Sequence, residues 1–234
     1  MIEFYKKHGL VVYWFLLLLD CWDNSASRIE NQGEYGYYLK GLLFLSLILL
    51  LSLNFNKRHH TTSKWLVFTA LTLNVIGHYF NLGDTANMAF IGYSFFGVSN
   101  LLFVIFMYRL SKREEISSKE PFIMGALVTI GCILFIYKSK ADFAGFTYFA
   151  YAYGIVSVLM LVYAVKLYSV KNKKSTALNC FIPAAVLTVA SGIVLVVLRI
   201  SGEKSGFNIL RITEILCSGY AVALMTNGAK KVLK

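Results

Sequence analysis

Residues 41–55 read GLLFLSLILLLSLNF, and this stretch decides the fold class. It holds no charged side chain, and its apolar residues do not alternate with polar ones as they would in the strands of a membrane barrel. A run of about 20 apolar residues crosses the hydrocarbon core of a bilayer as a helix, which satisfies its own backbone hydrogen bonds. Together with the residues just before it, the stretch predicts a membrane-spanning helix over residues 37–55.

The same pattern returns along the whole chain. Its 234 residues are 57% hydrophobic and include only two prolines, a composition too apolar for a soluble domain of this size. The sequence therefore predicts an all-α polytopic membrane protein, a helical bundle that forms one transmembrane domain over residues 1–234. The predicted spans are residues 9–22, 37–55, 65–83, 88–110, 121–138, 144–169, 177–200 and 208–229.

The first predicted span is the weakest, because its uncharged stretch covers only residues 9–19. Lys6 and Lys7 ahead of it resemble the basic start of a signal peptide, whereas Asp20 and Asp23 argue against cleavage. If this segment does not cross the membrane, seven spans remain and the N-terminus changes side.

The Lys and Arg residues lie mostly in short loops between the apolar runs. The net charge of +11 therefore favours cytoplasmic loop charge over a nucleic-acid partner. With a cytoplasmic N-terminus and eight alternating spans, 16 of the 23 Lys and Arg residues fall inside and six outside, while Lys40 lies at an outer helix edge. This split predicts a plasma membrane protein, in the inner membrane of a bacterium, with both termini cytoplasmic.

Ionisable and polar groups inside spans are costly and usually face the interior of the bundle. Five such residues share the outer half of the predicted membrane: Lys40, His78, Asn100, Ser191 and Glu214. If the helices turn them inward, they line one polar cavity that opens outward.

Each of these residues also has a plainer explanation. Lys40 can extend to the lipid head groups, His78 can be a hydrogen-bonded interior histidine, and Asn100 can join two helices. Glu214 can pair with Arg211, one turn earlier on the same helix, or with Lys40 from another helix. The polar end of the stretch GHYFNLGD, 77–84, is expected to put Asp84 in a tight outer turn.

The sequence predicts no metal and no cofactor. Its four cysteines are scattered, with no Cys/His cluster of metal-ligand spacing. We find no glycine-rich phosphate loop and no nucleophile elbow.

Several short motifs resemble the YhhN family of eight-helix membrane proteins, which includes lysoplasmalogenases. The resemblance covers about residues 37–110 and rests on Lys40-Gly41-Leu42, on Gly77-His78, on Gly92 fifteen residues later, and on Phe95-Phe96 before Asn100. His78 stands where the family has an aspartate, and Asn100 where it has a histidine. Ser191-Gly192 stands where the family has a Ser-Asp pair.

The resemblance implies hydrolysis of the vinyl ether of a lysoplasmalogen, a lysophospholipid, to an aldehyde and a glycerophospho-base. The reaction needs a proton donor to the enol-ether carbon, for which a carboxylic acid in a low-dielectric site is suited. Glu214 is the expected acid, and His78 a second acid or base. Lys40 is expected to hold the phosphate, with Asn100 and Ser191 as further substrate contacts.

Two other functions stay open at this point. One is a non-catalytic membrane protein that binds lipid or acts as a scaffold and keeps the fold without the site. The other is a small-molecule transporter, although no internal repeat supports it. Membrane lipid is a partner under every interpretation, and the oligomeric state stays open.

Overall fold

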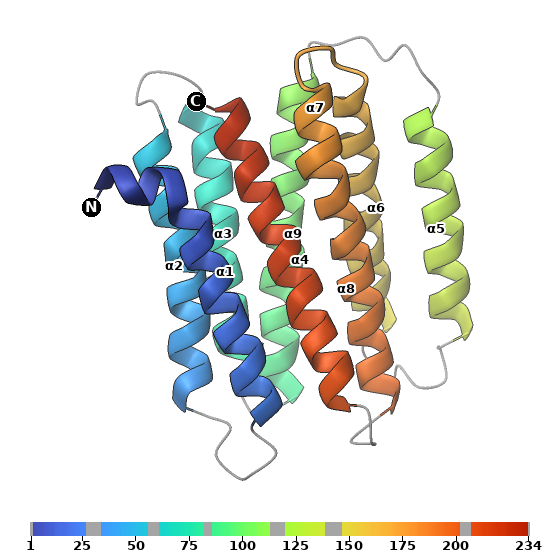
Figure 1. Cartoon of the computed structure of the whole chain (residues 1–234). Helices are drawn as coiled ribbons and strands as arrows, with labels where there is room; N and C mark the ends of the chain where they lie inside the picture. Colours follow the sequence, from blue (N-terminus) through green and yellow to red (C-terminus); the bar gives the residue numbers. More distant parts are fainter. Residues whose placement is uncertain are drawn as a thin grey trace. The chain divides into compact units, whose positions relative to one another are not determined.

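The computed structural model describes residues 2–26, 34–55, 61–81, 86–112, 120–138, 147–201 and 207–233. These residues fold into long α-helices and contain no strand, which confirms the predicted all-α class (Figure 1). The helices are α1 (Ile2–Ala26), α2 (Glu34–Asn54), α3 (Thr61–Asn81), α4 (Ala86–Ser111), α5 (Glu120–Lys138), α6 (Thr147–Tyr168), α7 (Lys174–Thr176), α8 (Ile182–Ser201) and α9 (Phe207–Val232). A π-helical turn, Ala177–Phe181, joins α7 to α8 without a break.

These helices match the eight predicted spans to within a few residues, except that α1 extends well beyond the predicted span at both ends. Its 25 residues make a helix of about 37 Å at about 1.5 Å per residue. Four stretches of the described chain are long and apolar enough to cross a membrane: Phe90–Ser111, Tyr151–Tyr168, Lys174–Leu195 and Ile209–Val232. Tyr38–Asn54 is a shorter apolar stretch of the same kind.

The chain divides into two compact units. Unit 1 comprises Met1–Leu102 and Ala229–Lys234, and unit 2 comprises Phe103–Gly228. The prediction of a single domain over residues 1–234 stays a prediction, and each unit is described by itself.

In unit 1, α2 packs against both α1 and α3. The buried side of α2 is a stripe with helical spacing that includes Leu43, Leu47 and Leu50, each at most 2% exposed. Between α3 and α4, Asn74 donates a hydrogen bond to the hydroxyl of Ser99, which in turn donates to the carbonyl of Ala70 over 2.8 Å. Polar side chains thus join two apolar helices in this unit.

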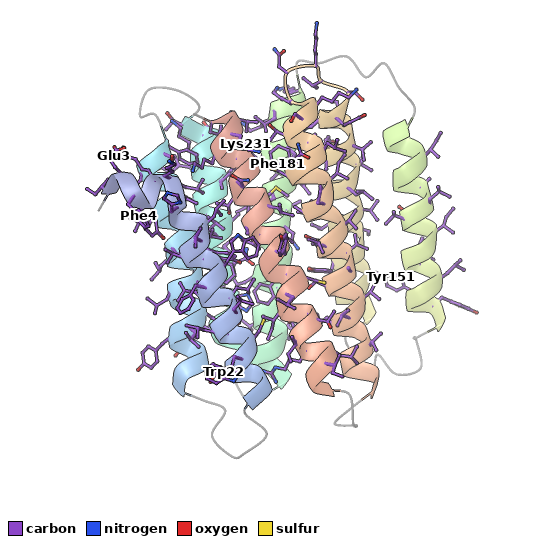
Figure 2. The ribbon with its side chains drawn as sticks, viewed as in Figure 1. Glu3, Phe4, Trp22, Tyr151, Phe181 and Lys231 are labelled. Atoms are coloured by element: carbon purple, nitrogen blue, oxygen red, sulfur yellow. The ribbon has the colours of Figure 1, made fainter. Side chains whose placement is uncertain are left out.

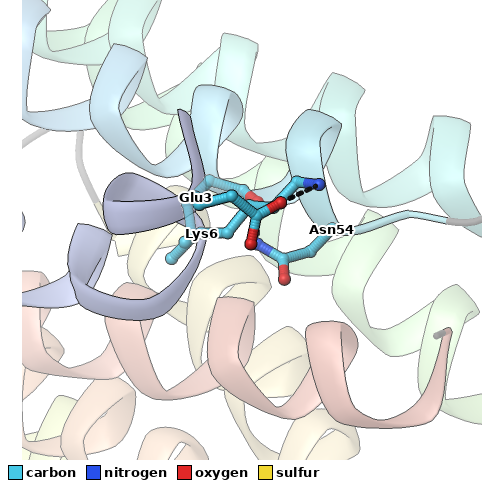
Figure 3. Close-up of polar contacts among 4 residues, drawn as sticks. Glu3, Lys6 and Asn54 are labelled. Atoms are coloured by element: carbon cyan, nitrogen blue, oxygen red, sulfur yellow. Dashed lines mark hydrogen bonds and ion pairs between the residues drawn. The ribbon is translucent and has the colours of Figure 1, made fainter. Parts of the chain in front are cut away.

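The two ends of the chain meet in unit 1. Lys230 Nζ donates a hydrogen bond to the carbonyl of Lys6 over 3.0 Å. Lys6 also pairs with Glu3 at 3.4 Å, and Asn54 at the end of α2 lies beside this pair (Figure 3). Both termini therefore lie at the same end of unit 1.

In unit 2, α6 packs against α5 and α8. The π-helical turn comes just before Pro183, which has no backbone N–H and cannot make the ordinary helical hydrogen bond. Buried residues continue through the turn into α8, including Cys180, Phe181 and Ala184. The wider π-helical turn therefore accommodates the missing hydrogen bond at Pro183, and one apolar face of the helix stays continuous.

Candidate functional site

Ser191 and Glu214, two of the predicted site residues, meet in unit 2. Ser191 on α8 is 5% exposed, and its hydroxyl donates a hydrogen bond to Glu214 Oε1 on α9 over 3.3 Å. The hydrogen bond runs between two helices and fixes one oxygen of the carboxyl group. Ionisable groups are rare inside apolar membrane helices, so this carboxyl group is a candidate functional group.

Tyr153 on α6 packs against Gly192, which follows Ser191 in the chain. A β-carbon at Gly192 would lie 2.9 Å from Tyr153 Cε1, so the tyrosine ring packs directly on the glycine. The resemblance described from the sequence implies that the family has a carboxylate at the position of Gly192. In this chain an aromatic ring covers that position, and only a glycine leaves room for it.

Lys40 and His78, two more of the predicted residues, both lie in unit 1. Lys40 on α2 is 8% exposed and lies close enough to His78 on α3 to interact with it electrostatically. The imidazole lies between two aromatic rings. Its centroid is 5.0 Å from that of Phe44 in a stacked arrangement and 4.6 Å from that of Phe96 in an edge-on one.

His78 has an unsatisfied buried atom. Its Nδ1 is buried, and it has no hydrogen-bond partner among the residues that the structure describes. Buried polar atoms nearly always have a partner, so this nitrogen can take one hydrogen bond beyond those that the described residues make.

Gly77 and Gly92, which carry part of the resemblance, have a packing role. A β-carbon at Gly77 would lie 2.6 Å from Phe96 Cε1 and 3.0 Å from the carbonyl oxygen of Gly92. The glycine lets α3 and α4 approach closely and leaves room for the Phe96 ring, which lies against His78. Asn100, further along α4, is half-buried and has a partner of its own.

Asp20 on α1 is a buried acidic residue that the sequence analysis did not place in a site. It is 2% exposed and interacts electrostatically with Tyr13, two turns earlier on the same helix. The sequence analysis used Asp20 only as an argument against signal-peptide cleavage. A charged residue within an apolar run was the signal that could have found it.

Some predictions concern other parts of the chain. The Gly83-Asp84 turn lies outside the described residues. Within the described part, no three His, Cys, Asp or Glu residues form a group that could hold a metal ion. The common cavity of Lys40, His78, Asn100 and Glu214 joins residues of both units and stays a prediction.

A sequence model of the YhhN family matches residues 36–226. The chain belongs to the YhhN family. The match covers most of the chain, well beyond the predicted region of resemblance at residues 37–110, and it includes the Ser191–Glu214 pair. Together with the long apolar helices, membership of the YhhN family indicates a membrane protein.

Searches among curated proteins and among solved structures found no match. Because the YhhN match begins at residue 36, all of α1, including Asp20, lies in the part of the chain that precedes it.

Proposed function

We propose that this YhhN-family protein hydrolyses the vinyl-ether bond of lysoplasmalogen-type lysophospholipids. The observation that carries the proposal is the carboxyl group of Glu214, inside an apolar helix and held by a hydrogen bond from Ser191 of another helix. Vinyl-ether hydrolysis needs one well-placed proton donor and one water, and it needs neither a metal nor a redox cofactor.

In the proposed reaction, Glu214 donates its proton to the vinyl carbon that is not bonded to oxygen. The electrons of the double bond form the new C–H bond, and the vinyl carbon bonded to oxygen becomes part of an oxocarbenium ion. Water adds to that carbon and gives up a proton, which restores the carboxylic acid of Glu214. The resulting hemiacetal splits into a fatty aldehyde and a glycerophospho-base with a free hydroxyl group, so the reaction consumes one water in all.

The other site residues have supporting roles in the proposal. Ser191 orients the carboxyl group, and Lys40 pairs with the phosphate of the head group. His78 is a second acid or base, and Asn100 is a polar contact for the substrate. The proposed setting is the inner membrane of a bacterium, with both termini cytoplasmic, as the distribution of Lys and Arg favours.

The change Glu214→Gln tests this proposal, because it keeps the shape of the side chain and removes the transferable proton. Purified wild-type protein should release aldehyde from a lysoplasmalogen, and the variant should release none. Thermal stability should change by no more than about 1–2 kcal/mol, as for most single substitutions. Glu3→Gln makes the same chemical change at an exposed carboxylate and should leave the rate unchanged.

A second function is favoured by the substituted family positions. The Tyr153 ring covers Gly192, and His78 replaces an acidic residue, which fits a lipid-binding protein that keeps the fold without the reaction. In that case the wild-type protein would bind lysophospholipids and release no aldehyde. Glu214→Gln would then lower stability and leave lipid binding intact.

A further inference from the structure

The hydrogen bond between Ser191 and Glu214 is long. Its two oxygen atoms are 3.3 Å apart, whereas hydrogen bonds between oxygen atoms usually measure about 2.5–3.0 Å. A further separation of a few tenths of an ångström between α8 and α9 would therefore break it. The contacts that hold α8 in place beside Ser191 consequently decide how the carboxyl group of Glu214 is oriented.

The next residue along α8 makes a tight contact with a different helix. A β-carbon at Gly192 would lie 2.9 Å from Cε1 and 3.4 Å from Cδ1 of Tyr153 on α6. Successive residues of an α-helix point about 100° apart, so Ser191 faces α9 while Gly192 faces α6. One turn of α8 thus contacts α9 through a hydrogen bond and α6 through the tyrosine ring.

The close packing of the π-helical turn on α9 lies away from this contact. There Phe181 meets Gly228, where a β-carbon would lie 2.5 Å from the phenylalanine ring. Tyr151, two residues before Tyr153, and Phe181 lie toward opposite ends of unit 2 (Figure 2). Phe181 precedes Ser191 by about 15 Å of helix, so contacts nearer to Ser191 set how α8 is seated there.

Tyr153 is itself held within α6. Its backbone carbonyl accepts a hydrogen bond of 2.9 Å from the hydroxyl of Ser157, and Tyr153 has a further interaction of its own. Carbon atoms in contact usually lie about 3.5–4.0 Å apart, so a methyl group at residue 192 would force a displacement of at least about 0.6 Å. This displacement is larger than the long hydrogen bond from Ser191 can absorb.

We infer that the packing of Tyr153 on Gly192 positions the carboxyl group of Glu214. Gly192 and Tyr153 are positioning residues, because they act through Ser191, whose hydroxyl holds one carboxyl oxygen. A misplacement of about 1 Å in a reacting group can cost on the order of a hundredfold in rate. The inference rests on the proposed function for the role of Glu214 and adds the residues that keep this proton donor in place.

The NMR signal of the Glu214 carboxyl carbon tests the inference without turnover. Full-length protein in detergent is labelled with ¹³C at the side-chain carboxyl groups of glutamate, and the Glu214 signal is the one that Glu214→Gln lacks. Ser191→Ala removes the hydrogen-bond donor and shows where the signal of the released carboxyl group lies. Gly192→Ala should move the signal in the same direction, although it changes no atom of Ser191 or Glu214.

Changes at residue 153 identify the packing as the cause. Tyr153→Phe keeps the ring carbons that meet Gly192 and should leave the signal unchanged. Tyr153→Leu removes the ring and should move the signal, and it adds no atom to the contact, so it tests the inference even if Gly192→Ala does not fold. The double variant leaves room for the methyl group, so its signal should lie closer to wild type than that of either Tyr153→Leu or Gly192→Ala.

Turnover gives a second measurement. Gly192→Ala should lower kcat for a lysoplasmalogen about tenfold, as the loss of one hydrogen bond predicts. KM should stay unchanged, because the contact acts on the reaction step and not on substrate binding. The control is Gly131→Ala, where a β-carbon would meet nothing within 4 Å, and it should change neither kcat nor the Glu214 signal.

Three outcomes would overturn the inference. One is a Gly192→Ala protein with the wild-type Glu214 signal. The second is a Tyr153→Phe protein whose signal moves as far as in Tyr153→Leu, since the hydroxyl and not the packing would then act. The third is a double variant farther from wild type than either single variant. Absence of aldehyde release by wild-type protein would contradict the proposed reaction alone, because the NMR signal is measured without turnover.

Discussion

Gly228 lies against a fully buried aromatic ring in unit 2. A β-carbon there would lie 2.5 Å from Phe181 Cε1 and 2.8 Å from Cζ. Phe181 is 0% exposed and has Phe106 at its edge, so its ring has little room to move. Gly228→Ala should therefore destabilise the protein by about 1–3 kcal/mol, the usual cost of overpacking a core.

The matched control for this prediction is Gly131→Ala on α5, where a β-carbon would meet nothing within 4 Å. That change should leave the protein equally stable or slightly more stable, because alanine favours the helix. Thermal unfolding in detergent measures both variants. Equal midpoints for the two variants would contradict the described packing of Phe181.

At the scale of single residues, the sequence predicts that a polar group lies in a span but not which way it points. Lys40, His78, Ser191 and Glu214 stood out because each interrupts an apolar run. The structure adds the partners, because the Ser191–Glu214 hydrogen bond depends on how α8 and α9 are rotated. Asp20 was not singled out as an interior residue, because its burial depends on how α1 packs against α2.

At the scale of helices, Lys173 stabilises the end of α4 within unit 2. Its Nζ donates a hydrogen bond to the carbonyl of Leu110 over 2.6 Å. The last carbonyls of a helix have no partner within the helix and attract a positive charge. Lys173→Met should therefore lower stability by about 1.5–3 kcal/mol, the usual contribution of a hydrogen bond to a charged group.

Lys171→Met is the matched control for Lys173→Met, because Lys171 is exposed in the same turn. It removes the same charge and should leave the thermal unfolding midpoint unchanged. If Lys173→Met and Lys171→Met lower the stability equally, the effect comes from the lost charge, and the hydrogen bond to Leu110 contributes nothing.

The helices themselves were largely predictable, because an uninterrupted apolar run of this length has few alternatives to a helix. The exceptions have local causes. The predicted span at residues 9–22 is shorter than α1 because Lys6 and Lys7 come just before its apolar run, whereas the helix continues through both. The π-helical turn at Ala177–Phe181 could not be predicted from the sequence. One extra residue in a single turn does not visibly change the periodicity of an apolar run.

At the scale of the whole molecule, the account predicts that the chain crosses the membrane an even number of times. The hydrogen bond from Lys230 to the carbonyl of Lys6 places both chain ends at one end of unit 1. The distribution of Lys and Arg puts that end in the cytoplasm. A fluorescent-protein fusion after Lys234 should therefore fluoresce, and an alkaline phosphatase fusion at the same residue should be inactive.

An active phosphatase fusion at Lys234 would mean that the C-terminus is external. Fusions at both chain ends distinguish the two possible causes. If both ends are external, the chain is inverted and the charge argument is wrong. If only the C-terminus is external, the number of crossings is odd, and the contact between Lys230 and Lys6 could not form in the membrane.

The central claim is that a carboxyl group in this bundle protonates the vinyl carbon of a lysoplasmalogen, and turnover in heavy water tests it most directly. Purified wild-type protein is incubated with a lysoplasmalogen in D₂O, and the aldehyde is trapped at once and analysed by mass spectrometry. The account predicts release of aldehyde that carries one deuterium on the carbon next to the aldehyde group, and no release by Glu214→Gln. Wild-type protein that releases no aldehyde, or a Glu214→Gln protein that releases it at the wild-type rate, would contradict the account.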